Sequence, residues 1–377
     1  MRIAIFENIM TEGGNEIEFN RILVDELKNL GHDVFFYVPE NFTFRLDYGV
    51  PVFKIKGDSV SYTNSGGIKK IFASMKREIN RYRWYAQLYE LQNNFDALII
   101  PTATYRYLRT LNHSNLKKIK VPLIFVFHGI NPAEAPKFLS ESEKLLPNSN
   151  IKMAVISLSN NIFGKTLDNI YTINPPVFVA RDLKADKKLN PPEVLTVGFF
   201  GQYRREKKIQ DLLQAFTNGN YNRKVKLLVQ GATMHKEDAE EFERIIKPYE
   251  ESENISVLRG ALIGKDWQQA IINVDALLLP YSAPRFKYHW GGMLFTALGY
   301  EKPVVISDDM NPEIFTNYNI GETFKSGDLN SLTSTLENFI NNFDKNFSIY
   351  QRSLKTLNEK FAPINFAKHL EKIILEK

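Results

Sequence analysis

Residues 194–216, VLTVGFFGQYRREKKIQDLLQAF, contain a complete strand, loop and helix. The apolar run from Val194 to Phe200 has strand length and predicts a buried strand. Gly201 to Lys208 follows as a loop with four cations, and Ile209 to Phe216 has the apolar spacing of a helix. Val225 to Val229 predicts the next strand. The order strand, helix, strand is the unit from which parallel sheets are built.

The first residues of the chain repeat this arrangement. Arg2 to Phe6 predicts a strand, a loop with Gly13-Gly14 follows, and apolar residues from Phe19 to Leu30 are spaced as in a helix. Gly31 is placed to end that helix, and Asp33 to Val38 predicts the second strand. Both halves of the chain therefore begin with the same α/β pattern.

Further apolar runs of strand length recur along both halves: Ala97 to Ile100, Leu123 to Phe127, Met153 to Ile156, Ile255 to Leu258, Ala276 to Leu279 and Val304 to Ile306. These runs are continuous rather than alternating, which indicates parallel sheets covered by helices on both faces. We therefore expect an α/β protein of two doubly wound, Rossmann-like domains that face each other across a cleft. Ligands of such folds bind beyond the carboxyl ends of the strands, which places the site in that cleft.

The stretch from Lys184 to Pro192 is rich in lysine, ends in two prolines and predicts a linker. We expect an N-terminal domain at residues 1–180, a linker at 181–192, a C-terminal domain at 193–345 and a helical segment at 346–377. A length of 377 residues suits two domains.

The composition excludes several classes of site and location. There is no cysteine, so disulfides, thiolate metal sites and cysteine nucleophiles are excluded. Met1 leads directly into a strand, so we expect no signal peptide, and no apolar run is long enough to cross a bilayer. We expect a soluble cytoplasmic protein, and a peripheral position at the inner face of the membrane stays open.

The cations are concentrated in one part of the chain. The net charge of +5 is too small for a dedicated nucleic-acid binder, yet residues 54–120 hold 13 Lys and Arg against 4 Asp and Glu. Within this stretch, residues 69–85 interleave cations with Phe, Tyr and Trp. Such a segment can lie on an anionic membrane, or it can be a helix whose aromatic side chains pack into its own domain. The sequence leaves both possibilities open.

Two segments of the C-terminal half carry the candidate chemistry. Arg204 offers a bidentate fork and Lys207 a point charge, and both would neutralise the charge on a leaving diphosphate. Gly291 to Leu294 open an apolar helix whose first amides are available to phosphate. If the two segments face one another, they form a two-sided diphosphate cradle. For the cationic loop taken alone, a solvated charged loop is the alternative.

The N-terminal half contributes Gly13-Gly14 and His128. The two glycines would let a phosphate or sugar approach the start of the first helix, or they form a plain turn. They do not form the G-x-G-x-x-G fingerprint, which argues against a nicotinamide dehydrogenase. His128 ends a strand at the cleft, where it is either a functional group or a structural hydrogen-bonding residue. The six histidines show no ligand spacing, so no metal site is expected.

In this order and spacing, the motifs resemble those of GT-B glycosyltransferases, most of all family 4. Leu30-Gly31-His32-Asp33-Val34 resembles the end of the family's first helix and the start of its second strand. Gly201 to Lys208 resembles the donor loop G-x-x-R-x-x-K-G, with Lys208 at the usual glycine. Asp275 to Tyr281 is similar to the strand A-D-x-x-x-x-P-S. Pro303-Val304-Val305 resembles G-x-P-V-V, with Glu301 where glycine is common.

Two further segments are similar to the end of the family's N-terminal domain. Ala154 to Ser159 resembles its last strand, and Ile173 to Val177 resembles the segment before the hinge. One departure stands out: the family's two donor-site glutamates, eight positions apart, correspond here to Tyr288 and Thr296. Their loss leaves the diphosphate cradle intact, but it leaves open both the identity of the donor and whether the chain turns it over.

The resemblance implies a retaining, metal-independent hexosyltransferase that moves a sugar from a UDP- or GDP-linked donor to a glycan or glycolipid, without a further cofactor. Arg204 and Lys207 would be catalytic together with His128. Leu262 and Ile263 would flank the base, and the C-terminal helix would cross back to the N-terminal domain. Two alternatives remain: a nucleotide-sugar 2-epimerase of the same fold, and a non-catalytic sugar-nucleotide-binding or membrane scaffold protein.

Overall fold

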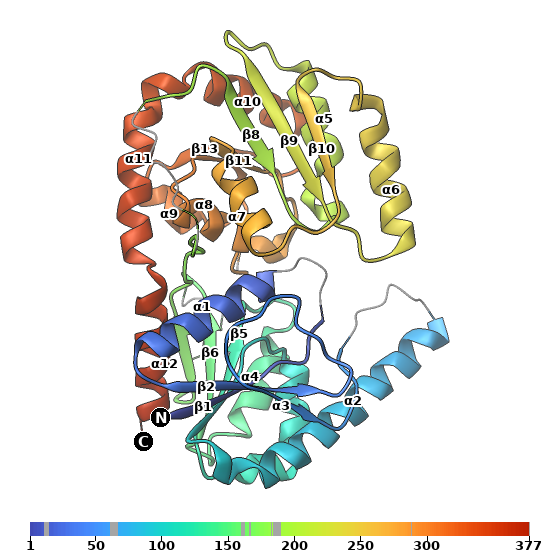
Figure 1. Ribbon diagram of the computed structural model, residues 1–377, viewed down its shortest axis with the longest axis vertical. Helices are drawn as coiled ribbons and strands as arrows, with labels where there is room; N and C mark the ends of the chain where they lie inside the picture. The colour runs from blue at the N-terminus through green and yellow to red at the C-terminus, as the bar shows by residue number, and fades with distance from the viewer. Residues whose placement is uncertain are drawn as a thin grey trace.

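The computed structural model describes residues 1–10, 15–60, 67–159, 163–165, 167–181, 183, 190–287 and 289–376. In this part of the chain two parallel sheets form two separate layers, one in each half of the molecule (Figure 1). No helix within the described ranges is both long enough and apolar enough to cross a membrane.

The N-terminal sheet has the strand order β3-β2-β1-β4-β5-β6-β7, and every pair is parallel. Its strands are β1 (Arg2–Phe6), β2 (Asp33–Pro39), β3 (Val52–Ile55), β4 (Ala97–Ile100), β5 (Leu123–Phe127), β6 (Ile151–Ile156) and β7 (Ile170–Ile173). The helices of this half are α1 (Asn15–Asn29), α2 (Gly67–Glu90), α3 (Tyr105–Asn112) and α4 (Ala135–Glu143).

The C-terminal sheet has the order β10-β9-β8-β11-β12-β13, again with every pair parallel. Its strands are β8 (Leu195–Phe199), β9 (Val225–Gly231), β10 (Ile255–Arg259), β11 (Ala276–Leu279), β12 (Val304–Ser307) and β13 (Gly321–Phe324). The helices are α5 (Ile209–Asn218), α6 (Lys236–Ile246), α7 (Lys265–Ile272), α8 (Gly292–Gly299), α9 (Pro312–Asn317), α10 (Leu329–Asn341), α11 (Phe343–Lys360) and α12 (Pro363–Leu375).

Burial explains which strands the sequence predicts. The central strands β4, β5, β6, β11 and β12 are buried along their whole length, which requires continuous apolar runs. The expected strands are all present, within about two residues at each end. The three strands that were not predicted, β3, β7 and β13, lie at sheet edges and are partly exposed. One expectation is corrected: β7, and not the segment from Ala154 to Ser159, is the last strand of the N-terminal half.

The strand order of each sheet fixes where a ligand can bind. It reverses between β1 and β4 in the first sheet and between β8 and β11 in the second. At such a switch point the loops leave neighbouring strands in opposite directions and open a crevice at the carboxyl ends. The two doubly wound domains expected from the sequence are therefore confirmed. The boundaries of the predicted linker stay untested, because residues 182 and 184–189 lie outside the described residues.

The last two helices join the two halves. Figure 1 shows α11 beside the C-terminal sheet and α12 beside the N-terminal sheet. Lys152 of β6 donates to the carbonyl of Ile373 in α12 at 2.7 Å, and the Phe366 ring packs 5.6 Å from that of Phe19 in α1. The predicted return of the C-terminal helix to the N-terminal domain is confirmed.

A second connection between the halves lies at residues 177–178. The amide of Val177 donates to the carbonyl of Phe361 at 2.9 Å, and that of Phe178 to Phe295 at 3.2 Å. Gly299 ends α8 against the same segment, where a Cβ atom would lie 1.8 Å from the Phe178 carbonyl oxygen. Only glycine fits at this contact.

Candidate active site

A cavity of about 380 Å³ lies between the two domains, at the carboxyl ends of both sheets. Its N-terminal wall comes from the loops after β4 and β5 and from the first turns of α1 and α4. Its C-terminal wall comes from the loops after β8 and β11, from α7 and from the start of α8. The described residues of its N-terminal wall include Glu16, Thr102, Thr104, Tyr105, His128, Asn131 and Glu134, and those of its C-terminal wall Gly201, Arg204, Lys207, Trp267, Tyr281, Arg285, Trp290, Gly291, Gly292 and Met293.

The loop after β8 places Lys207 in the cavity wall. Gly201 has φ +116°, and a Cβ atom there would lie 2.8 Å from Lys207 Nζ, so the glycine makes room for the ammonium group. This ammonium lies over the Tyr281 ring, 5.3 Å from its centroid. Burial, together with the nearby charge of Arg204, lowers the Lys207 pKa to about 7.

The same loop explains the departure from the family glycine at position 208. Lys208 has φ 53° and ψ 40°, the left-handed conformation that glycine adopts without strain. It ends η3 (Arg205–Lys207) and directs the chain into α5. Glu301, the other residue at a family glycine, also has a positive φ, 52°. The backbone at both positions has the shape that the family glycines favour.

Two further charged residues accompany Arg204 and Lys207. Arg285, from η5 (Pro284–Lys287) after β11, lines the cavity and forms an ion pair with Glu206. Arg204 lies 3.9 Å from the same carboxylate oxygen, with its side chain about half exposed. The C-terminal wall thus presents three cations around one carboxylate. The sequence did not single out Arg285, although its place five residues after Pro280, beyond the carboxyl end of a strand, could have indicated it.

The opposite side of the cradle is the start of α8, where Gly291, Gly292 and Met293 line the cavity. In a helix, the amides of its first residues have no partner within the helix itself, so those of Gly292 and Met293 are available to a ligand in the cavity. The amide of Leu294 already donates to the Gly291 carbonyl at 2.8 Å.

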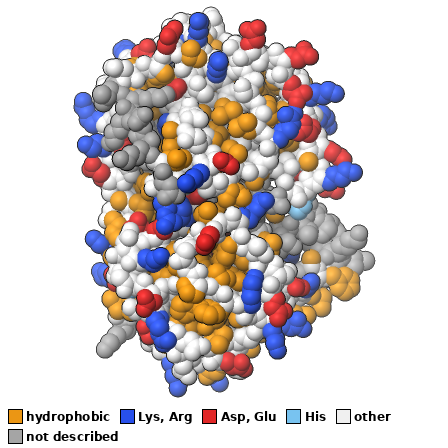
Figure 2. Space-filling model, viewed as in Figure 1, with side chains coloured by type: hydrophobic (Ala, Val, Ile, Leu, Met, Phe, Trp, Pro, Cys, Tyr) orange, Lys and Arg blue, Asp and Glu red, His pale blue; other side chains and the backbone are white. Residues whose placement is uncertain are grey.

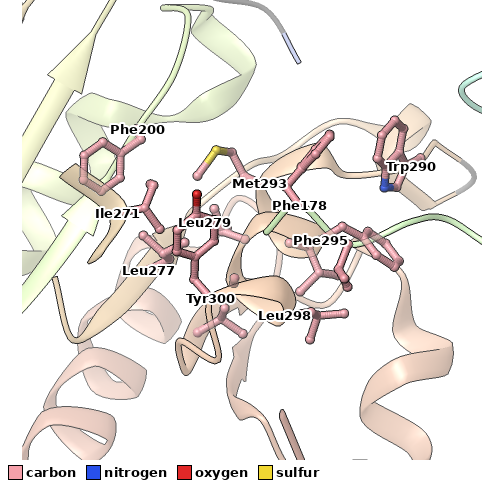
Figure 3. Close-up of a cluster of buried hydrophobic side chains, with 14 of the residues drawn as sticks. Phe178, Phe200, Ile271, Leu277, Leu279, Trp290, Met293, Phe295, Leu298 and Tyr300 are labelled. Atoms are coloured by element: carbon pink, nitrogen blue, oxygen red, sulfur yellow. The ribbon is translucent and has the colours of Figure 1, made fainter. Parts of the chain in front are cut away.

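Most of α8 packs into the core, and Met293 both lines the cavity and contributes to that core. Figure 3 shows Met293, Phe295 and Leu298 of this helix among the buried side chains around β11. Thr296 is 1% exposed, and its hydroxyl donates to the Gly292 carbonyl at 2.9 Å. Leu294 and Thr296 do not line the cavity, so their contact with the donor stays a prediction.

Four residues that line the cavity each have a buried polar atom without a hydrogen-bond partner among the described residues. They are Thr102 Oγ1, Tyr281 Oη, Arg285 Nε and Trp290 Nε1. All four are donors, and buried donors are normally satisfied. Because all four belong to residues that line one cavity, we interpret them as donors that an oxygen-rich ligand could satisfy.

His128 lies where the two domains touch. Its ring packs against Phe19 at 4.6 Å and against Trp290 at 5.1 Å, and its carbonyl accepts from the Trp290 amide at 3.3 Å. His128 Nε2 donates to the Pro101 carbonyl at 2.9 Å, which leaves Nδ1 as an acceptor. Burial lowers its pKa to about 4. At neutral pH it is therefore an uncharged hydrogen-bonding residue and not a proton donor.

The other predicted site residues are placed as follows. Gly13, Gly14 and Tyr288 lie outside the described residues. Leu262 and Ile263 lie in the loop between β10 and α7 and do not line the cavity, so their contact with a base stays a prediction. The structure adds Thr102, Thr104 and Tyr105 after β4 and the carboxylates of Glu16 and Glu134 to the cavity wall. No cluster of three or more His, Asp or Glu suited to a metal ion occurs in the described ranges.

Comparisons with known proteins bear on this geometry. Residues 180–355 match the sequence model of the family "Glycosyl transferases group 1". This part of the chain is therefore similar to the group 1 glycosyl transferases. The match covers β8 to β13 and therefore the whole C-terminal wall of the cavity. It confirms the glycosyltransferase class expected from the sequence. No curated protein matches the chain.

Solved structures share the whole two-domain arrangement. HepE of Anabaena, in complex with UDP and glucose, is 14% identical with a TM-score of 0.69, over 99% of this chain and 98% of that one. A glycosyltransferase of Rickettsia africae is 15% identical with a TM-score of 0.66, over 100% and 99%. WaaG, a glycosyltransferase involved in lipopolysaccharide biosynthesis, is 13% identical with a TM-score of 0.64, over 100% of both chains. The GT-B fold is confirmed over the full length.

Proposed function

We propose that this glycosyltransferase moves a sugar from a nucleoside-diphosphate donor to an acceptor hydroxyl held by the N-terminal domain. The observation that supports this most is the convergence of three cations, the first amides of α8 and four unpaired donors on one interdomain cavity. A diphosphate supplies the acceptors and the negative charge that this set lacks. UDP is the first nucleotide to test, since HepE is in complex with UDP and glucose.

Each part of the cavity then has a role. Arg204 and Lys207 hold the diphosphate and stabilise it as the leaving group, while the amides of Gly292 and Met293 bind it from the other side. His128 Nδ1 and the N-terminal wall accept hydrogen bonds from the sugar and the acceptor. Closure of the domains excludes water, which would otherwise compete as acceptor.

Calorimetry with UDP and GDP tests this assignment. The double variant Arg204→Ala, Lys207→Ala should weaken diphosphate binding by about 2 kcal/mol or more, roughly 30-fold, because two charge-assisted contacts are lost. A thermal-shift screen of nucleoside diphosphates identifies the base. Unchanged affinity in the double variant would remove the cradle from the mechanism.

Retention of the anomeric configuration and independence from metal complete the proposal. Retention rests on the resemblance to family 4. Metal independence is supported by the three basic residues of the C-terminal wall, which can neutralise the negative charge of the diphosphate in place of a divalent ion. Proton NMR of the first product formed identifies its anomer and so tests retention. Activity that survives removal of metal ions by a chelator would support a mechanism in which basic side chains alone neutralise the diphosphate.

A nucleotide-sugar 2-epimerase is the second candidate. Such an enzyme needs carboxylates near the sugar, and Glu16 and Glu134 line the N-terminal wall even though the family glutamates are absent. The two reactions differ in a direct observable. Incubation of the donor in D₂O without acceptor would place deuterium at C2 of the sugar only if an epimerase acts. If the protein binds UDP but neither transfers nor epimerises the donor sugar, the alternative of a non-catalytic sugar-nucleotide-binding or membrane scaffold protein is favoured.

We further infer a peripheral membrane contact through the N-terminal half of α2. Ile71, Phe72 and Met75 are 56–66% exposed, and Figure 2 shows hydrophobic side chains where α2 projects from the domain. The other end of the predicted segment packs into its own domain, because Trp84 and Tyr85 are fully buried.

Co-sedimentation with phosphatidylglycerol-rich vesicles tests this contact. The variant Ile71→Ser, Phe72→Ser should lose binding, because its aromatic and aliphatic anchors are removed. The control is Ile349→Ser on α11, which changes another exposed apolar residue (44%) outside α2. Equal binding by both variants would leave α2 as a solvated helix.

A further inference from the structure

Glu206 is a carboxylate beside the cations of the C-terminal wall, although it does not itself line the cavity. Its Oε1 atom pairs with Arg285 Nη2 and lies 3.9 Å from Arg204 Nη1. The neighbouring Lys207 reaches the cavity from the same loop. One carboxylate therefore supplies the counter-charge for two guanidinium groups, at the place where the cations of the C-terminal wall meet.

The backbone brings these groups together independently of their charges. The amide of Ser282 donates to the Glu206 carbonyl at 2.8 Å, which ties the loop after β11 to the loop after β8. Arg285 lies against the ring of Phe286, with its Cζ atom 5.0 Å from the centroid. The two loops thus hold Arg285 beside the cradle even if the ion pair with Glu206 is broken.

Arg285 also has unused binding capacity. Its Nε is buried and has no partner within the described part of the chain, and its side chain lines the cavity. A guanidinium group has five N–H donors in a planar fork that matches a phosphate, and the ion pair with Glu206 uses only part of that fork. Arg204 and Arg285, together with the protonated form of Lys207, outnumber this one carboxylate, so the site has a net positive charge that a diphosphate can neutralise.

We infer that Arg285 is a third diphosphate-binding cation, and that Glu206 is an internal counter-anion which the diphosphate displaces from Arg285 when the donor binds. The inference rests on the proposed function and adds one positioning interaction to it. Glu206 keeps the cations in place in the empty cleft and competes with the ligand, so a phosphate must be a better partner for the fork than this carboxylate.

The test is the calorimetric affinity for UDP and for inorganic pyrophosphate at low salt, where exposed charges are least screened. Arg285→Gln should lower the affinity for both ligands about tenfold or more, because a charge-assisted contact is lost. Glu206→Gln should raise the affinity for both ligands about threefold to tenfold, because the competing carboxylate charge is removed. In an Arg285→Gln background, most of the gain from Glu206→Gln should disappear.

The control uses a second ion pair of the same loop. Arg205 pairs with Glu241 at 2.8 Å, and its side chain is 81% exposed and absent from the cavity lining. Arg205→Gln and Glu241→Gln should leave the affinity for UDP within about twofold, since a surface pair of this kind contributes little. Circular dichroism of each variant confirms that it folds.

The outcomes separate the two claims. Wild-type protein that binds neither UDP nor GDP overturns the proposed function. Wild-type binding that Arg285→Gln leaves unchanged overturns only the role of Arg285. Weaker binding after Glu206→Gln would show that Glu206 positions the cations and is not displaced. If Arg285→Gln does not fold, the sign of the Glu206→Gln effect alone decides the inference.

Discussion

UDP binding should be coupled to the uptake of a proton by Lys207. With a pKa of about 7, this side chain is largely neutral at pH 8 in the empty cleft. The groups that act on its charge are Arg204 and Arg285, which disfavour it, and Glu206, which favours it. His289, also in the cavity wall, has a pKa lowered to about 4 by burial, so it is neutral above pH 7 and does not contribute.

A bound diphosphate adds negative charge beside Lys207 and so raises its pKa again. If the pKa in the complex exceeds 9, the protein takes up about 0.9 proton per UDP at pH 8, since about nine tenths of Lys207 is neutral beforehand. Above pH 7 the affinity should then fall by up to about tenfold per pH unit, equivalent to about 1.4 kcal/mol. The sign follows from protonation: the binding-competent lysine is the charged one, so binding is stronger at lower pH.

Calorimetry in two buffers of different ionisation enthalpy measures the proton number directly. The titrations run from pH 7.5 to 9, above the second phosphate pKa of about 6, and avoid phosphate buffer, which would compete. Lys207→Arg is the matched control, because its guanidinium is always charged and should abolish the uptake while UDP still binds. Uptake by wild type below about 0.2 proton per UDP at pH 8 would refute the argument that the cleft discharges this lysine.

Three further predictions concern the backbone and α8. Gly299→Ala should lower the free energy of unfolding by at least about 2 kcal/mol in chemical denaturation, because its Cβ would lie 1.8 Å from the Phe178 carbonyl oxygen. A loss below about 0.5 kcal/mol would show that the backbone moves at little cost to make room for the Cβ. Lys208→Gly should raise the free energy of unfolding by about 0.5–1 kcal/mol, because glycine adopts the left-handed conformation without strain, whereas Lys208→Ala should not raise it. Thr296→Val should leave UDP affinity within about twofold in calorimetry, because the hydroxyl bonds inside the helix. A larger loss there would place Thr296 at the ligand.

The fold could be predicted from the sequence wherever burial is complete. A strand covered on both faces must be apolar at every position, so β4, β5 and β11 were found with their observed bounds. The edge strands β3, β7 and β13 have partly exposed residues and carry no such run. Their existence depends on pairing with a neighbour that is distant in the sequence, which no local pattern records.

The candidate site was predicted where one loop carries several functional residues. Arg204 and Lys207 stand out together because they share a single loop with a recognisable spacing. Arg285 comes from another loop, and only the pairing of β8 with β11 brings it beside Glu206. The same limit applies to α2: its composition indicated aromatic residues among cations, but only the packing shows that Phe72 is exposed and Trp84 is buried.

The two walls of the cleft differ in charge, and this difference can determine which wall binds the donor and which binds the acceptor. Among the described residues that line it, the cations Arg204, Lys207 and Arg285 all belong to the C-terminal wall, while the carboxylates Glu16 and Glu134 belong to the N-terminal wall. Two unit charges 4 Å apart interact by about 1–4 kcal/mol in surroundings of this kind, enough to set an orientation. We therefore expect a diphosphate to be attracted to the C-terminal wall and repelled from the other, which would turn the donor sugar towards the N-terminal domain. On that side, hydroxyl groups can donate to the carboxylates, whereas a phosphorylated acceptor would face like charge.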